Sequence, residues 1–542
     1  MKLNLKTKKF LIIEDHAAMR KAIREMLYTL AAELITEASN GLNAIAAMEK
    51  EKFDIVLCDY NLGIGKNGQQ VLEEAKYRKL LPYKAIFIMV TAEQNQSMVL
   101  GAMENKPDEY LTKPFNAQQL LTRLERNYGF KEYLADIEQA LADGHLSLAI
   151  RYCDDKLLEN NRRMHSSLLK LRAELAVKVG DFKKATAIYQ EILTQREVYW
   201  ARQGTGIIAY LQNDFAGAIT IFQKLIEEHP MLLETYDWLT RTYEALGNFP
   251  AAQRTLDSAT KLSPQAILRQ KKLAAIADKT GQLDVAEKAY KAAVNLGKHS
   301  VHKSPSDFSG LAKIYSKTNA NQAALKTLLQ MREEYINDPE AELRAATLET
   351  EVYHHLGDES SSKRAYEKAR KLSEKLGDKI PSDLRLDFAQ TCFLNGDHET
   401  ANRQVEQLIR NNIDDENFID DVRHMLKATG LADRAEALIQ PIRQAMIETN
   451  NKGVDLYKRG KLTEAALVFQ KAIDAMPENK TIIINMAKIL LCDLKASGFD
   501  RTKFLKAQSF INKAAVLGVT PDKIGHLQLQ LEKLSPSVHA KS

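Results

Sequence analysis

The chain has 542 residues, which corresponds to three or four domains at about 150 residues per domain. Glycine (24 residues) and proline (13 residues) are depleted, each to about half of its average frequency. This depletion argues against collagen-like, proline-rich disordered and all-β chains and favours long helices with short connections. The formal net charge of +5 is small for this length. The protein as a whole is therefore not expected to have the strongly basic surface that binds nucleic acid.

The cysteines and the apolar runs predict a cytoplasmic protein. The four cysteines are far apart and form no CxxC pair: Cys58, Cys153, Cys392 and Cys492. Such spacing is typical of reduced thiols. The apolar run Phe10–Ile13 is too short for a signal-peptide core. No run of about 18 apolar residues predicts a membrane span.

Residues 1–130 alternate short apolar runs with amphipathic stretches. The expected strands are Phe10–Ile13, Glu33–Glu37, Ile55–Cys58, Ala85–Val90 and Glu109–Thr112. Five helices are expected among them, the last from about Phe115 to Asn127. This alternation predicts an α/β doubly wound fold with a five-stranded parallel sheet. The reactive site of such a sheet lies at the carboxyl ends of its strands.

Polar side chains stand at the ends of four of these strands: Glu14 and Asp15, Asp59, Thr91, and Lys113. Carboxylates brought close together repel one another unless a cation is present, and Mg²⁺ suits a site of a few carboxylates and a phosphate. A carboxylate can also be the nucleophile and form an aspartyl-phosphate. A lysine and a threonine would then hold the phosphoryl oxygens.

Five segments resemble the CheY-like receiver domain of two-component response regulators: LIIEDH (11–16), SNGLNAI (39–45), DIVLCDYNL (54–62), IMVTA (88–92) and DEYLTKPF (108–115). The resemblance implies that Asp59 is the phosphoacceptor. It implies a Mg²⁺ site formed by Glu14, Asp15, Asp59 and the backbone carbonyl of Asn61. It also implies phosphoryl contacts from Thr91 and Lys113, and a switch role for Tyr110. Unlike many family members, the loop at 61–68 has no proline and looks one residue longer.

After residue 130 the sequence repeats itself. A small or turn-forming residue is followed five positions later by Ala or Ser at ten places, beginning at Gly144, Gly180, Asn213, Gly247, Gly281, Asn319, Gly357, Gly396, Gly430 and Gly460. Prolines 17 residues after three of these turns stop the second helix: Pro230, Pro264 and Pro477. The clearest units are Thr235–Pro264, Leu268–Leu296 and Asn451–Pro477.

This pattern resembles the tetratricopeptide (TPR) repeat, a helix–turn–helix of about 34 residues. The resemblance implies an all-α TPR superhelical solenoid over residues 131–534, with about ten to eleven hairpins, and a frayed tail over 535–542. Gly297–Asp307 looks like a loop inserted between repeats. First helices of such hairpins line a groove, which implies a partner surface with Trp200, Ile207, Tyr210, Asp237 and Arg241. The alternative is that Trp200 and Tyr210 only pack between helices.

Together the two parts resemble the VieB-like receiver–TPR regulators of marine γ-proteobacteria. This resemblance implies a response regulator that is not an enzyme. Its receiver would catalyse only its own phosphorylation and dephosphorylation. A sensor histidine kinase or phosphotransfer protein would phosphorylate Asp59, and one or more protein or peptide ligands would occupy the TPR groove. Two alternatives stay open: a scaffold with a silent receiver, and a transcription-related regulator that binds DNA or polymerase.

Overall fold

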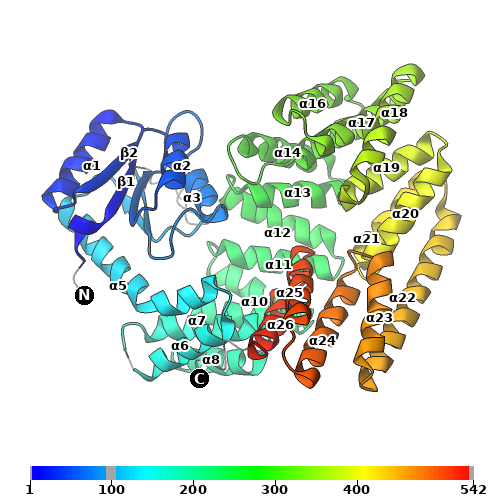
Figure 1. Ribbon diagram of the computed structural model, residues 1–542. Coiled ribbons are helices and arrows are strands. Elements are labelled where there is room, and N and C mark those ends of the chain that lie inside the picture. Colours follow the sequence, from blue (N-terminus) through cyan, green and yellow to red (C-terminus); the bar gives the residue numbers. More distant parts are fainter. Residues whose placement is uncertain (1–2, 93–104, 160, 536–542) are drawn as a thin grey trace. The chain divides into compact units, whose positions relative to one another are not determined.

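The computed structural model describes residues 3–92, 105–159 and 161–535. These residues form two compact units. The first unit contains Met1–Gly144, Asp155–Ser166 and Asn213–Leu311, and the second contains His145–Asp154, Ser167–Gln212 and Ala312–Ser542. Figure 1 shows a sheet with flanking helices at the N-terminal end of the chain and helices throughout the rest. Within the described ranges, no helix is both long and apolar enough to cross a membrane.

The N-terminal part is a five-stranded parallel sheet with strand order β2-β1-β3-β4-β5. Its strands are β1 (Lys9–Ile13), β2 (Leu34–Ala38), β3 (Ile55–Asp59), β4 (Ile86–Thr91) and β5 (Glu109–Thr112). Two of the three interior strands, β3 and β4, are buried along their whole length, as expected for strands that are covered on both faces. The chain builds the sheet outward in one direction from β1 to β2 and in the other direction from β3 to β5. The carboxyl ends of β1 and β3 therefore flank the topological switch point, where such sheets bind ligands.

Helices cover both faces of this sheet (Figure 1). They are α1 (Ala17–Thr29), α2 (Gly41–Lys50), α3 (Gly68–Tyr77) and α5 (Ala117–Ala142), with a short 3-10 helix, η1 (Leu5–Thr7), before β1. Alternate strand residues enter two cores: Leu11 and Val56 pack with α2 and α3, whereas Phe10 and Ile55 pack with α1 and α5. The fourth expected helix falls within 93–104, outside the described residues.

Helix α5 differs from the prediction. The sequence predicts a helix that ends near Asn127. Instead α5 runs without a break from Ala117 to Ala142. Its interior Gly129 costs only about 1 kcal/mol relative to alanine, which packing at both ends offsets: Leu120 and Leu124 are buried on the sheet, and Leu134 and Ile137 further along the chain are also buried.

The remaining chain is all helical. Its helices are α6 (Leu146–Leu158), α7 (His165–Lys178), α8 (Phe182–Gln195), α9 (Tyr199–Leu211), α10 (Phe215–Glu228), α11 (Leu233–Ala245), α12 (Phe249–Leu262), α13 (Ile267–Lys279), α14 (Leu283–Gly297), α15 (Pro305–Lys317) and α16 (Asn321–Glu334). They continue as α17 (Pro339–His355), α18 (Glu359–Leu376), η2 (Gly377–Lys379), α19 (Ser382–Leu394), α20 (His398–Asn412), α21 (Glu416–Ala428), η3 (Ala432–Arg434), α22 (Ala435–Lys458), α23 (Leu462–Ala475), α24 (Lys480–Ser497), α25 (Arg501–Val516) and α26 (Pro521–Lys533).

The ten predicted turn residues share one backbone conformation. All ten have positive φ, between 58° at Asn319 and 79° at Gly144, a region that glycine and asparagine tolerate best. The residue after several of these turns caps the next helix, as when Asp181 accepts a hydrogen bond from the Lys184 N–H at 3.1 Å. The turn residue therefore ends one helix and its neighbour starts the next.

Small residues let the paired helices approach closely. The predicted small residue five positions after each turn is buried in every hairpin, as at Ala185 and Ala465. In α22, a Cβ added to Gly453 would lie 2.3 Å from the Phe469 ring of α23. Only glycine leaves room for the Phe469 ring at this position of α22.

Helix α22 departs from the repeat pattern. The sequence placed the start of a unit at Asn451, but this residue lies inside the single helix Ala435–Lys458. The second helix of one hairpin and the first helix of the next have merged. No glycine or proline stands at the expected junction, so nothing in the local sequence ends the helix there.

The second unit also joins segments that are far apart in the chain. The Glu532 carboxylate of α26 accepts the backbone N–H groups of Leu146 and Ser147, at 2.8 and 2.9 Å. A carboxylate at this position stabilises the N-terminus of α6. Nearby, a Cβ added to Gly525 would lie 1.9 Å from the Lys178 carbonyl oxygen of α7, so α26 packs closely on α7.

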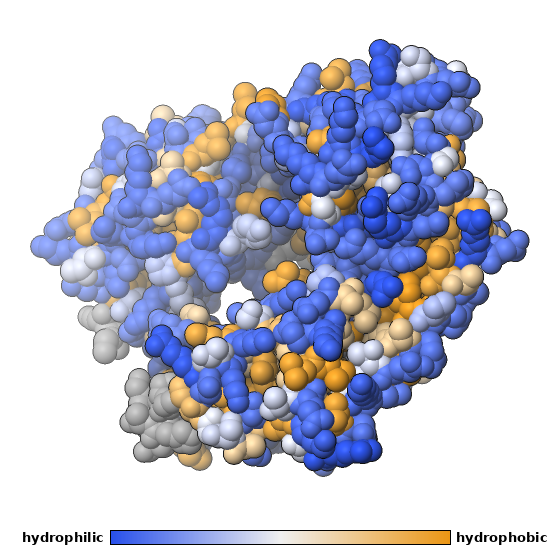
Figure 2. Space-filling view, turned by 45° about the vertical axis from the view of Figure 1, so that its right-hand side comes forward, coloured by the Kyte–Doolittle hydropathy of each residue, from blue (hydrophilic) through white to orange (hydrophobic). Residues whose placement is uncertain are grey.

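The surface is mostly polar. Figure 2 shows a face that is largely hydrophilic with separate apolar patches. Exposed apolar side chains include Val516, Leu467 and Phe499. Single exposed apolar residues are normal for folded proteins.

Candidate functional site

Three carboxylates meet at the carboxyl ends of β1 and β3. Glu14 follows β1 and is buried, Asp15 is exposed, and Asp59 is the last residue of β3 and is 9% exposed. One ligand oxygen from each of the three side chains lies within 4.8 Å of the others. The topology explains this convergence, because β1 and β3 are parallel neighbours with Ile13 opposite Cys58.

Lys113 joins two of these carboxylates. Its Nζ donates to Glu14 Oε2 at 2.7 Å and to Asp59 Oδ2 at 2.9 Å. Burial raises the pKa of the Glu14 carboxyl, and the nearby charge of Asp59 adds to this effect. Burial lowers the pKa of Lys113, but its hydrogen bonds to Glu14 and Asp59 outweigh burial, so that its pKa is raised. The lysine therefore stays charged at the centre of the site.

Thr91 is fixed beside the lysine by the backbone. It ends β4, is 1% exposed, and its carbonyl accepts the Lys113 N–H at 2.7 Å. One strand further on, Tyr110 of β5 is half-buried and packs against the core between the sheet and α2 and α3. The structure thus brings Thr91 and Lys113 together and places the Tyr110 side chain against the core.

The loop after Asp59 lies close to the carboxylates. Asn61 is exposed, and its side-chain Oδ1 accepts the Gly63 N–H at 3.3 Å. A Cβ added to Gly63, whose φ is +69°, would lie 3.1 Å from Asp15 Oδ2. At the end of the loop, a Cβ added to Gly68 would lie only 2.2 Å from the Asp59 carbonyl oxygen. The first residue of α3 therefore rests directly on the backbone of Asp59.

The donor set fits a hard divalent cation. Three carboxylates can supply oxygen ligands from one rim, and Asp15 contributes its ligand from an exposed position. Mg²⁺ prefers such oxygen ligands and keeps several waters, for which an exposed rim leaves room. Glu14, Asp15 and Asp59 form the three-residue acidic cluster of the described chain that could hold a metal.

The groove residues expected on α9 are partly used in packing. The Trp200 ring meets the Tyr189 ring edge-on at 6.2 Å between centroids, and it packs against the core of α7, α8 and α9. Ile207 and Tyr210 are half-buried. For Trp200, these contacts agree with the alternative of packing between helices.

The groove residues expected on α11 differ from each other. Asp237 forms a two-pronged ion pair with Arg269 of α13, with both distances 2.8 Å. Arg241 is exposed and stacks over the Trp238 ring at 4.9 Å. Asp237 thus ties two neighbouring hairpins together, and Arg241 is the more accessible of the two.

Sequence reasoning missed the role of Lys66. Its Nζ forms an ion pair with Glu74 of α3 at 2.8 Å and donates to the His299 carbonyl at 2.7 Å. The loop Gly297–Asp307, which stood out as an insertion, was the signal that could have pointed to this contact.

Comparisons with known proteins agree with the geometry. A family model described as a response regulator receiver domain matches residues 10–125, and one described as a tetratricopeptide repeat matches residues 170–230. Chemotaxis protein CheY-3 of Vibrio cholerae serotype O1 is 30% identical over 121 residues, which cover 22% of this chain and 92% of that protein. Chemotaxis protein CheY of Pseudomonas aeruginosa is 30% identical over 118 residues, or 22% of this chain and 94% of that protein.

Solved structures include a similar repeat protein. A tetratricopeptide repeat protein from Parabacteroides merdae is 14% identical, with a TM-score of 0.29, and the match covers 45% of this chain and 93% of that one.

Proposed function

This chain belongs to the response regulators, with a CheY-like receiver domain followed by tetratricopeptide repeats, and we propose that phosphorylation of Asp59 controls which proteins the repeats bind. The observation that carries the proposal is the convergence of three carboxylates, two of which accept hydrogen bonds from the half-buried Lys113. We assign residues 1–130 to the receiver, 131–534 to the repeats and 535–542 to a tail.

Asp59 is the nucleophile in this proposal. One of its carboxylate oxygens bonds to phosphorus while the P–N bond of a phosphohistidine in a kinase or phosphotransfer protein breaks, and the departing ring nitrogen keeps the electron pair. The product is an aspartyl-phosphate, which carries about two negative charges at neutral pH where the free carboxylate carried one. No further catalytic activity is assigned to the chain.

The surrounding side chains have separate roles. Glu14, Asp15, Asp59 and the Asn61 carbonyl would hold Mg²⁺, which offsets charge on the phosphoryl oxygens. Lys113 already lies 2.9 Å from Asp59 Oδ2 and would pair with one of these oxygens. The Thr91 hydroxyl would hold another. Both groups stabilise charge through positions fixed by the fold.

The change at Asp59 then reaches the rest of the chain through Thr91 and Tyr110. Tyr110 lies on β5, next to the strand that carries Thr91, so a shift of Thr91 changes the packing around the Tyr110 ring. The expected fourth helix of the receiver lies outside the described residues. Partners are a sensor kinase or phosphotransfer protein, and protein or peptide ligands of the repeats in the cytoplasm.

Incubation with acetyl phosphate and Mg²⁺, read by intact-protein mass, tests the phosphoacceptor. The wild type should gain one phosphoryl group, and Asp59→Asn should gain none. Asp54→Asn is the matched control, because Asp54 immediately precedes the opposite end of β3. Equal absence of the phosphoryl group from the wild type and Asp59→Asn would contradict the proposal and favour a scaffold with a silent receiver.

A further inference from the structure

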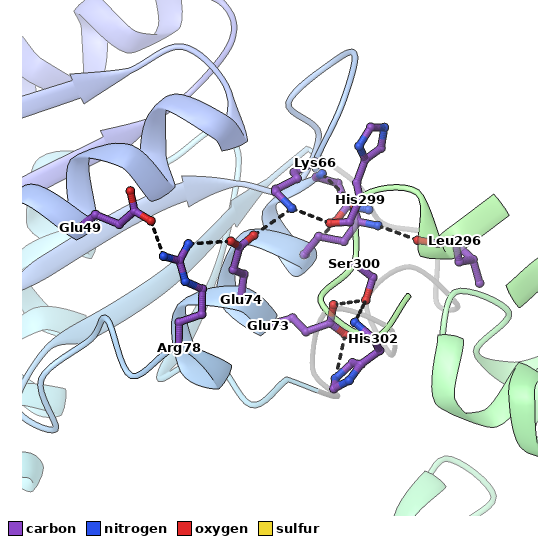
Figure 3. A network of polar contacts seen from close by, with 11 residues as sticks. Glu49, Lys66, Glu73, Glu74, Arg78, Leu296, His299, Ser300 and His302 are labelled. Carbon is purple, nitrogen blue, oxygen red and sulfur yellow. Dashed lines mark hydrogen bonds and ion pairs between the residues drawn. The ribbon is translucent and has the colours of Figure 1, made fainter. Parts of the chain in front are cut away.

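The receiver has a second connection to the repeats besides α5. The loop between α14 and α15, residues 298–304, lies against α3 of the receiver within the first compact unit. Figure 3 shows the two segments facing each other, with polar side chains between them. We call this set the α3–loop contact, formed by Lys66, Gln70, Glu73, Tyr77, Leu296, His299, Ser300 and His302.

Glu73 is at the centre of the contact. Its Oε2 accepts the Ser300 hydroxyl at 2.6 Å, and its Oε1 lies 3.7 Å from His302 Nε2 (Figure 3). The His302 ring also meets Tyr77 edge-on, with 5.8 Å between centroids. Glu73 is 13% exposed and Ser300 only 5%, so this pair is shielded from water and its loss would leave buried polar groups unpaired.

Two backbone carbonyls complete the contact. Lys66 donates to the His299 carbonyl at 2.7 Å, and Gln70 Nε2 donates to the Leu296 carbonyl at 3.3 Å. Both acceptors lie at or just after the C-terminal end of α14, where carbonyls lack helical partners. The receiver therefore supplies donors to the end of a repeat helix.

The contact is directly linked to Asp59. Lys66 and Gln70 flank Gly68, whose Cα faces the Asp59 carbonyl so closely that a Cβ would lie 2.2 Å away. The Gly68 N–H also donates to the Tyr60 carbonyl at 2.8 Å. No side chain separates Asp59 from the start of α3, so a shift of the Asp59 backbone moves Gly68 and the donors on either side of it.

We propose that the α3–loop contact holds the loop 298–304 against the unphosphorylated receiver and that phosphorylation of Asp59 releases it. This inference rests on the proposed function. Lys66 is the one basic residue in the segment 60–67 that follows Asp59, and added negative charge at Asp59 attracts it away from His299. The receiver then stays attached through α5 and through the ion pair between Lys106 and Glu234 of α11, and α14 and α15 lose a support at their connection.

Hydrogen exchange of the full chain, followed by mass spectrometry, tests the release. In the wild type, acetyl phosphate with Mg²⁺ should raise deuterium uptake in residues 298–304 several-fold at early times. Asp59→Asn should show no rise. Glu73→Ala, which removes the acceptor of Ser300, should show the raised uptake without phosphorylation and little further change with it.

Lys298→Ala is the matched control, because Lys298 is exposed in the same loop; it should behave as the wild type. Unchanged or lowered uptake in 298–304, in a wild type whose mass shows full phosphorylation, would overturn the release while leaving the proposed function intact. A wild type that gains no phosphoryl group would overturn the proposed function and the release together. Wild-type uptake in unphosphorylated Glu73→Ala would show that the contact does not hold the loop.

Discussion

Lys113 is the residue on which the charge balance of the site depends. Its side chain is 12% exposed and lies between the side chains of Glu14 and Asp59, of which 3% and 11% are exposed. Removing one partner of a buried ion pair leaves an uncompensated charge and is strongly destabilising. Here the loss would leave two neighbouring carboxylates facing each other without a cation in Mg²⁺-free buffer.

Lys113→Met should therefore lower the free energy of unfolding of the receiver by about 2 to 4 kcal/mol. The measurement is hydrogen exchange of the β3 segment in the full chain as a function of urea. Lys84→Met is the control, since Lys84 is 54% exposed and pairs with Glu132 at the surface; its effect should stay within about 0.5 kcal/mol. Equal effects of the two substitutions would show that Lys113 does not neutralise the site.

Many of the individual residues of the site could be predicted from the sequence. The carboxylates, Thr91 and Lys113 follow apolar runs, and parallel strands bring their carboxyl ends to one rim. The contact of Glu73 with Ser300 could not be predicted, because the two residues are 227 positions apart and neither belongs to a local pattern. Trp200 was ambiguous for a related reason: an aromatic residue at that helical position can face a groove or a neighbouring helix.

Among the elements, α5 is the one that carries the receiver into the repeats. A glycine inside a helix suggests a break, and the sequence predicts that the helix ends near Asn127, just before Gly129. Gly129 has no neighbour within 4 Å of an added Cβ. Its helical conformation is imposed by packing on either side, which a local reading of the sequence does not include.

Gly129→Ala should stabilise α5 by about 0.5 to 1 kcal/mol, because alanine loses less backbone entropy in a helix. Hydrogen exchange of residues 126–134 measures this effect. Gly144→Ala is a matched substitution at the end of the same helix, where φ is +79°, and it should destabilise by about 1 kcal/mol. A neutral or destabilising effect of Gly129→Ala would indicate that the helix is broken at this position.

The repeat turns were the most predictable elements. Each of the ten has a residue with positive φ followed five positions later by a buried small residue, and both requirements are visible in the sequence. Helix α22 was not predictable in the same way. The regular spacing of the turns suggests two separate helices, whereas the sequence between them lacks the residues that would end the first helix.

In the whole molecule, the receiver and part of the repeats belong to the first compact unit. Helix α5 is a permanent connection within this unit, and the α3–loop contact is one that can open. A switch requires partners to prefer one of the two states, since equal affinity for both would shift no population. The account therefore predicts that phosphorylation changes binding by the repeats.

Affinity capture with the purified full chain tests this central claim most directly. Wild type treated with acetyl phosphate and Mg²⁺, untreated wild type and treated Asp59→Asn are compared side by side in the source lysate, with quantitative mass spectrometry of the bound proteins. The account predicts that at least one bound protein changes about tenfold or more on treatment of the wild type, which corresponds to about 1.4 kcal/mol of differential binding, and does not change with Asp59→Asn. The same bound proteins in the same amounts from all three samples, with wild-type phosphorylation verified by mass, would contradict it.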